Sequence, residues 1–228
     1  MRSRPRVVPI PLGIVKAFLL QDQGAILVDT GPPGSAPRIQ QALAQEGLNL
    51  ADLSLILITH GHTDHFGSVA ALQEGSSAPV AVSRADAGAL RQGTNVPLQA
   101  RTSCMRLLQR MGGGIAQTAP PCEPDILLEG RADLASYGVE AEVIPTPGHT
   151  SGSVSILLPD GQALVGDLIM GGFVGRGRPG YPLVWDDPEA YQQSLRELLA
   201  TRPTCIHTSH GGPFTLEEVQ ARLGQAGT

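Results

Sequence analysis

Short apolar runs alternate with helical periodicities along the first part of the chain. Residues 15–20 and 25–28 are apolar and flank a polar turn that contains Gly24, which predicts a two-stranded hairpin. Residues 36–46 have the spacing of a helix, with Gly47 as its stop signal. Two more strands and one helix are predicted at residues 53–58, 80–82 and 66–74. This alternation predicts a layered α/β fold.

The later part of the chain contains another group of apolar runs. Four of them predict the strands of a second sheet, at residues 126–128, 140–145, 154–158 and 163–165. Helices are predicted at residues 188–200 and 216–223, and a last strand at residues 205–207. Two β-rich halves flanked by helices predict a four-layer αβ/βα sandwich of two mixed sheets, an α/β fold that some schemes class as α+β.

The middle of the chain is less regular. Residues 84–111 carry helical patterns that Gly93 and Pro97 interrupt, and a glycine- and proline-rich connection follows. We therefore expect a helical insertion around residues 84–111, which could close over an active site as a lid.

Composition and charge narrow the class of protein. The chain has 228 residues, of which 41% are hydrophobic and 16% charged, as in one folded domain over residues 1–228. The net charge of −5 and the scattered basic residues argue against a nucleic-acid partner. No apolar stretch reaches the roughly 18 residues of a membrane span. We expect a cytoplasmic monomer or homodimer with a small-molecule substrate and no membrane partner.

The three cysteines, Cys104, Cys122 and Cys205, fit neither a disulfide framework nor a cysteine zinc site. We expect free thiols. The alternative is a nucleophilic Cys205, which lies two residues before His207.

Three imidazoles and a carboxylate fall within six residues directly after the predicted strand at residues 53–58: His60, His62, Asp64 and His65. The chain has six histidines, and all fall in or near loops at strand ends. Imidazole nitrogens and carboxylate oxygens there can converge on a metal such as zinc at about 2.0–2.2 Å. The alternative is a polar loop whose histidines are solvated, but such a loop gives no reason for the histidines to cluster. The pattern therefore predicts a metal centre.

The run His60-x-His62-x-Asp64-His65, with Asp29 upstream, resembles the signature of the metallo-β-lactamase superfamily. Three later segments agree with that family in order and spacing, at residues 146–152, 165–168 and 209–213. The resemblance spans residues 15–214 and implies the sandwich fold predicted above, in the glyoxalase II-like or lactonase-like branch.

The resemblance also implies two divalent metal ions, with zinc expected and manganese or iron as alternatives. The implied ligands are His60, His62 and His149 for the first ion, Asp64, His65 and His210 for the second, and Asp167 for both. An aspartate at position 167 is informative, because the β-lactamases of the family usually lack a bridging aspartate. The resemblance thus favours ester or thioester hydrolysis.

Two divalent ions would share a water, lower its pKa and present a metal-bridging hydroxide to a polarised carbonyl or phosphoryl group. Asp64 is the predicted catalytic residue, because it could orient that hydroxide and pass its proton to the leaving group. Asp29 could support a ligand histidine by accepting its hydrogen bond, or could simply cap a turn. His207 is either a proton shuttle or a buried, hydrogen-bonded histidine.

The glycine-rich segment after Asp167 is expected to border the metals. Its arginines could hold an anionic substrate group, and its aromatic residues could form an apolar wall. The candidate pocket residues are Phe173, Arg176, Arg178, Tyr181, Trp185 and His207, with Leu107, Leu108 and Met111 from the insertion.

The leading hypothesis is a dinuclear hydrolase of small esters, thioesters or lactones. Alternatives on the same fold are a phosphodiesterase or phosphonate hydrolase, a β-lactamase, and an iron-containing persulfide oxidase or redox protein. Only 18 residues follow His210, with Arg222 the sole basic one, so the basic C-terminal region of full-length glutathione thioester hydrolases is not found in this sequence.

Overall fold

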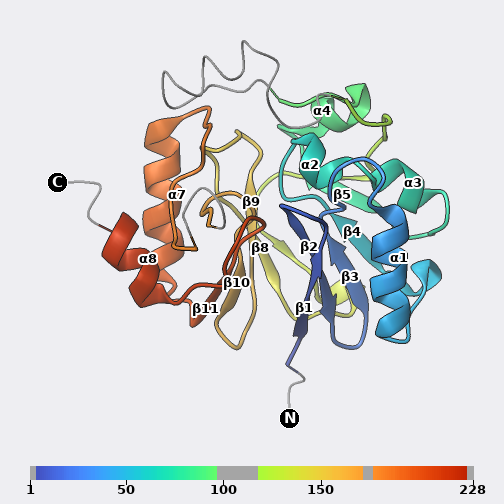
Figure 1. The fold of residues 1–228 in the computed structure, drawn as a ribbon, viewed down its shortest axis with the longest axis horizontal. Coiled ribbons are helices and arrows are strands. Elements are labelled where there is room, and N and C mark those ends of the chain that lie inside the picture. Colours follow the sequence, from blue (N-terminus) through green and yellow to red (C-terminus); the bar gives the residue numbers. More distant parts are fainter. Residues whose placement is uncertain (1–3, 97–117, 172–176, 225–228) are drawn as a thin grey trace.

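The computed structural model describes residues 4–96, 118–171 and 177–224, which form two sheets packed face to face between two helical layers (Figure 1). The first sheet has the order β1 (Arg6–Pro11), β2 (Lys16–Gln21), β3 (Ala25–Val28), β4 (Leu55–Leu57), β5 (Val80–Ser83) and β6 (Ile126–Leu128). The second has the order β11 (Cys205–His207), β10 (Gln162–Leu164), β9 (Val154–Leu157), β8 (Glu142–Pro145) and β7 (Ala132–Asp133). The predicted four-layer sandwich is confirmed.

The strand directions bring several loops to one edge of the sandwich. Strands β3 to β6 run parallel to one another, whereas β1, β2 and β3 pair antiparallel. In the second sheet only β10 and β11 pair parallel. The carboxyl ends of parallel strands meet at the same edge, so residues that follow β3, β4 and β5 lie near one another.

The helices cover the outer faces of the two sheets. On one side lie α1 (Ala36–Gln45) and α3 (Val69–Gln73), and on the other α7 (Pro188–Ala200) and α8 (Leu216–Leu223) (Figure 1). The short elements are α2 (Thr63–Phe66), α4 (Ala87–Gln92), and the 3-10 turns η1 (Leu50–Asp52) and η2 (Ala135–Tyr137). Asp187 and Thr215 cap α7 and α8 through side-chain acceptors, which explains the sharp starts of these helices.

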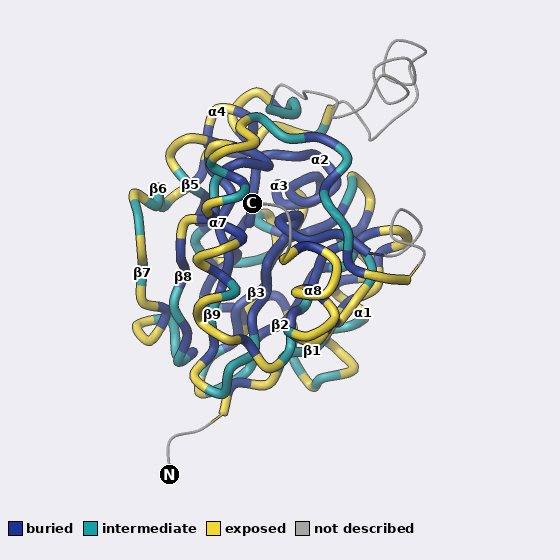
Figure 2. Tube along the Cα trace, turned by 90° about the vertical axis from the view of Figure 1, so that its left-hand side faces the viewer, coloured by how far each residue is buried: buried dark blue, intermediate teal, exposed yellow. Residues whose placement is uncertain are grey.

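Alternation along the strands builds the core. Leu19, Leu27 and Ile56 face α1 and α3, while their neighbours on the same strands pack between the sheets against strands such as β8 and β9. Both faces of the central strands are therefore buried, as the dark interior of Figure 2 shows. A third cluster joins the second sheet to α7 and α8.

Two predictions about secondary structure need correction, and one strand was not predicted. The run at residues 126–128 does not open the second sheet but forms β6, parallel to β5 at the edge of the first. Residues 6–11 form β1, an edge strand whose prolines are compatible with its single paired side. The helix predicted at residues 66–74 is shorter, because the residues before Val69 belong to α2 and a break.

The predicted insertion at residues 84–111 is described only up to residue 96, where it contains α4; the rest lies outside the described residues. Thr94 pairs with Thr118 in an isolated antiparallel bridge, and the Ala119 amide donates to the Gly93 carbonyl at 2.8 Å. The chain therefore leaves and returns at adjacent points. Among the described helices none is both long and apolar enough to cross a membrane.

Candidate metal centre

The seven predicted ligands come from four loops that follow strand ends. His60, His62, Asp64 and His65 follow β4, and the other three follow β8, β10 and β11. They form three overlapping groups, each with its ligand atoms within 4.8 Å of one another: His60–His62–His149, His60–His65–Asp167 and Asp64–His65–His210. The structure thus brings all seven together.

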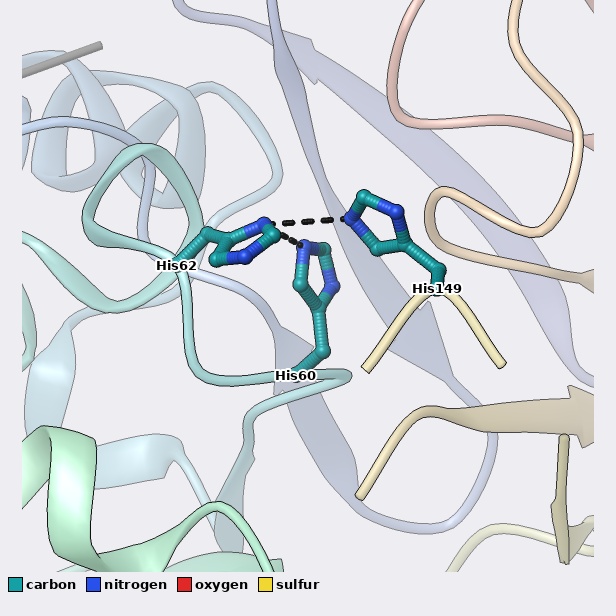
Figure 3. A group of neighbouring side chains, drawn as sticks. All are labelled: His60, His62 and His149. Atoms are coloured by element: carbon teal, nitrogen blue, oxygen red, sulfur yellow. Dashed lines mark hydrogen bonds between the residues drawn. The ribbon is translucent and has the colours of Figure 1, made fainter. Parts of the chain in front are cut away.

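Three imidazole nitrogens face one another in the first group (Figure 3). His62 Nδ1 lies 3.1 Å from His60 Nε2 and 3.1 Å from His149 Nε2. A single proton on His62 Nδ1 can serve only one of these two contacts. A tetrahedral zinc bound at 2.0–2.1 Å holds its nitrogens roughly 3.3 Å apart, so the spacing suits a shared cation.

Hydrogen bonds fix the orientation of two of these rings. Thr59 Oγ1 donates to Asp29 Oδ2 at 2.8 Å, so it must accept from His60 Nδ1 at 3.0 Å. His149 Nδ1 donates to the Val184 carbonyl at 2.9 Å. Both imidazoles therefore keep the proton on Nδ1 and point the lone pair of Nε2 inward.

The same arrangement recurs in the group of Asp64, His65 and His210, called the second group below. His65 Nδ1 donates to Asp29 Oδ2 at 2.8 Å, and His210 Nδ1 donates to the Ile14 carbonyl at 2.9 Å. Their Nε2 atoms point inward as well, and His65 Nε2 is buried with no hydrogen-bond partner in the part of the chain that the structure describes. Four outward acceptors thus leave four Nε2 atoms facing the centre.

Two buried carboxylates lie among these nitrogens. Asp64 Oδ2 is 3.3 Å from His210 Nε2, while Asp167 Oδ2 is 3.5 Å from His210 Nε2 and 3.7 Å from His149 Nε2. Asp167 therefore lies between the two groups. Both Asp64 oxygens and Asp167 Oδ1 are buried and accept no hydrogen bond from the described residues. Buried oxygens without a partner are costly unless a cation compensates them, so these residues fit bound metal.

The two groups differ in protonation. Burial lowers the pKa of His60, His62 and His149; for His62, burial and the neighbouring imidazoles together bring the pKa to about 3. The first group thus offers neutral imidazoles at neutral pH.

In the second group burial also opposes the charged imidazole, but nearby carboxylates outweigh it. Asp167 and Asp64 raise the pKa of His65 and His210. Burial would in turn raise the pKa of Asp167, yet His210 and His65 hold it well below its usual value. The carboxylates therefore favour the charged form of these rings, and the rings favour the charged form of Asp167.

Backbone features hold the ligand loops in place. Asp29 is fully buried at φ 61, a left-handed conformation that costs a non-glycine residue about 1–3 kcal/mol, and its hydrogen bonds to Thr59 and His65 retain it. Gly148 has φ 129, and a Cβ there would lie 2.3 Å from Tyr191 Cα. Only glycine lets the His149 loop sit so close to α7.

The predicted pocket residues are only partly covered by the structure. Trp185 follows Val184, whose carbonyl holds His149, and its ring lies 6.4 Å from that of Tyr181. Arg178 is exposed. Phe173, Arg176, Leu107, Leu108 and Met111 lie outside the described residues.

His207 lies away from the ligands. Its Nε2 is 2.8 Å from Gln162 Oε1 and 3.5 Å from Cys205 Sγ, and its ring packs edge-on against Phe18. These described contacts fit the alternative of a hydrogen-bonded histidine that packs against the first sheet. Burial, and then Asp160, raise the pKa of Cys205, which disfavours a thiolate nucleophile.

Sequence reasoning missed one buried carboxylate, Asp86. It follows β5 and accepts hydrogen bonds from two of the four ligand loops, from Gly61 in one and from Thr150 and Gly152 in the other. The available signal was its position: like Asp29, it stands just past the carboxyl end of a predicted parallel strand.

Comparison with known proteins agrees with this geometry. The sequence profile described as the metallo-beta-lactamase superfamily matches residues 10–210. The chain belongs to this superfamily. Within it, the chain is 31% identical over 209 residues to the probable metallo-hydrolase YqgX of Bacillus subtilis, covering 89% of this chain and 88% of that protein.

Other superfamily members give further points of comparison. A hydroxyacylglutathione hydrolase of Cereibacter sphaeroides is 33% identical, over 88% of this chain and 67% of its own length. The crystal structure of the BLEG-1 B3 metallo-beta-lactamase is similar with a TM-score of 0.70 and 26% identity, covering 95% of this chain and 97% of that one. Metallo-hydrolase relatives and the His/Asp cluster together support a metal-binding hydrolase.

Proposed function

We propose that the protein is a dinuclear metal-dependent hydrolase of small esters, thioesters or lactones. The observation that carries the proposal is the set of four imidazoles whose Nδ1 protons are all directed to outward acceptors, so that their Nε2 atoms face two buried carboxylates. Such an arrangement is costly for the fold without cations and suitable for binding them.

The ligand assignment follows the two groups. His60, His62 and His149 would hold the first ion, Asp64, His65 and His210 the second, and Asp167 both, with zinc the expected metal and manganese or iron the alternatives. Bound ions would supply a water acidic enough to attack at neutral pH and a Lewis acid for the substrate oxygen.

Asp64 is the proposed proton carrier. Its two oxygens are buried, and neither accepts a hydrogen bond from the described residues. Oδ1 can take the proton that the attacking water loses as it adds to the acyl carbon. The same oxygen then returns the proton to the alcohol or thiol as the acyl bond breaks, so the proton balance closes within the site.

Two observations support the acyl class of substrate. Asp167 lies between the two ligand groups, where the glyoxalase II-like and lactonase-like branch would have its bridging aspartate, and one relative is named a hydroxyacylglutathione hydrolase. A small-molecule substrate, a cytoplasmic location, a monomer or homodimer, and no nucleic-acid or membrane partner complete the proposal.

The test combines elemental analysis with an activity panel on one preparation: aryl esters, thioesters, lactones, a cephalosporin and an aryl phosphodiester. About two zinc or manganese ions per chain and chelator-sensitive turnover of acyl substrates are expected. Turnover of the cephalosporin or the phosphodiester alone would replace the acyl assignment. One iron per chain with persulfide-dependent oxygen uptake, or no metal, would overturn the dinuclear hydrolase.

A further inference from the structure

Asp86 is a fully buried carboxylate that is not one of the proposed ligands. It stands at the start of α4, three residues after β5. Its Oδ2 accepts from the Gly61 amide and from Thr150 Oγ1, both at 2.7 Å, and its Oδ1 accepts from the Gly152 amide at 3.0 Å. Three donors from two loops therefore converge on one side chain.

The two loops are those that carry the first ligand group. Gly61 lies between His60 and His62, and Thr150 follows His149. The loops come from different sheets, since one follows β4 and the other β8. Asp86 thus connects the sheets at the point where the three imidazoles meet.

The fit around Asp86 is close on both sides. A Cβ at Gly152 would lie 2.4 Å from Asp86 Cγ, and one at Gly61 would lie 3.2 Å from Asp86 Cβ. The arrangement also requires a carboxylate, because every neighbouring group donates. An asparagine would direct its NH2 group toward at least one backbone N–H, whichever way the amide turned.

The chain after Asp86 adds further contacts to the same loop. The Val96 amide donates to the Gly61 carbonyl at 3.0 Å, and Asn95 Oδ1 accepts from the Thr63 amide at 2.7 Å. Residues 86–96 therefore hold the loop from His60 to Asp64 through both the amide and the carbonyl of Gly61.

We propose that Asp86 is a positioning residue, which sets the separation of His60 and His62 from His149 and thereby the affinity for the first metal ion. The inference rests on the proposed function for the identity of the ligand but assigns Asp86 no contact with substrate or metal. Partners that orient metal ligands typically contribute about 10–100-fold to metal affinity.

The test measures zinc affinity by competition with a chromophoric chelator, using the full-length protein. Asp86→Asn is expected to bind the first zinc about 10–100-fold more weakly, and Thr150→Val, which removes one of the three donors, to show a smaller loss. Asp125→Asn is the matched control. Asp125 accepts from the Val80 amide at 2.8 Å, at the opposite end of β5 from Asp86. The Asp125→Asn substitution should lower thermal stability while leaving zinc affinity within about twofold of the wild type, as expected for distant, independent sites.

A second readout needs no metal. In the chelator-treated protein, peptides containing Gly61 and Gly152 should exchange amide hydrogen faster in Asp86→Asn than in the wild type, and not in Asp125→Asn. If Asp86→Asn does not fold, the affinity of Thr150→Val decides the test.

Wild-type zinc affinity in both variants would overturn the positioning role alone. A wild-type protein that binds no zinc would overturn both the positioning role and the proposed function.

Discussion

The two ligand groups face each other across Asp167, but their chemistry differs. The first consists of three imidazoles whose pKa values burial lowers, that of His62 to about 3. The second contains Asp64, whose buried oxygens have no hydrogen-bond partner among residues 4–96, 118–171 and 177–224, and two imidazoles whose pKa values the carboxylates raise. One group offers only neutral nitrogens, and the other also offers negative charge.

This difference suggests a division of labour. Neutral imidazoles can hold an ion but cannot carry a proton at neutral pH when their pKa lies far below 7. A carboxylate with vacant acceptor sites can do both. We therefore expect the first group to contribute mainly affinity and the second mainly catalysis. The predictions that follow test this contrast.

The largest effect is expected for Asp64→Asn. The amide cannot take up a proton, so turnover should fall at least about 10³-fold, within the range of general acid–base catalysis together with a lost ligand. Elemental analysis should still find about one ion per chain, held by the first group. Asp160→Asn, in the turn before β10, is the control and should change neither quantity. Loss of both ions would contradict the division.

Metal removal should have the next largest effect. Without cations, oxygens of Asp64 and Asp167 remain buried with no partner among the described residues. The folded state also loses the free energy that metal binding adds to its stability. Ions present at 100–1,000 times their Kd stabilise by about 3–4 kcal/mol, which for a domain of this size is a Tm shift of roughly 5–15 °C. Calorimetry with and without chelator checks this. Readdition of zinc should restore the Tm. A Tm that chelator leaves unchanged would contradict the claim that the buried carboxylate oxygens require a cation.

The metal-free protein should lose stability as the pH falls. His62 has a folded pKa of about 3 against 6.5 ordinarily, so between these values the unfolded chain binds more protons, and stability declines toward acid by up to about 1.4 kcal/mol per pH unit. The raised pKa values of His65 and His210 act in the other direction: their contribution is full below the unfolded pKa and is lost as the pH rises through the folded pKa.

Denaturant unfolding of the chelator-treated protein at pH 6.5 and pH 5 measures this dependence. His62→Gln, which cannot titrate, should make the acid-side loss smaller. An equally steep loss in that variant would show that another group is responsible.

The smallest effect is expected for His207→Gln. Because His207 bonds to Gln162 and packs on Phe18, turnover and metal content should stay within about twofold, while stability falls by about 1 kcal/mol. Steady-state kinetics and thermal unfolding measure both. A large loss of turnover without loss of stability would instead support the interpretation of His207 as a proton shuttle.

The sequence was most informative where local chemistry decides the structure. Helices α7 and α8 begin as predicted because Asp187 and Thr215 are strong capping residues. The loop from His60 to His65 was found because imidazoles rarely cluster without a reason, and the loops of His149, Asp167 and His210 were found through the resemblance to the metallo-β-lactamase superfamily. Strand β6 was placed in the wrong sheet, since an apolar triplet carries no information about its partner, and the choice between sheets depends on contacts far along the chain.

Asp86 illustrates a different limit. A single aspartate after a strand looks like an ordinary turn residue, and only the folded chain shows that its three donors come from loops in two sheets. The tautomers of the ligand histidines were equally out of reach, because their outward acceptors include the carbonyls of Ile14 and Val184, which no side-chain pattern identifies.

The bridge between Thr94 and Thr118 bears on how such a protein can diversify. It closes the chain on itself between β5 and β6, which are neighbours in one sheet, so the intervening residues 97–117 can be lengthened, shortened or exchanged without altering the register of any strand. The graft points for a chimaera are consequently defined, after Val96 and before Thr118. Exchange at these points leaves Asp86, Asn95 and every proposed ligand in the recipient, so lineages or engineers could vary this segment separately from the reaction centre.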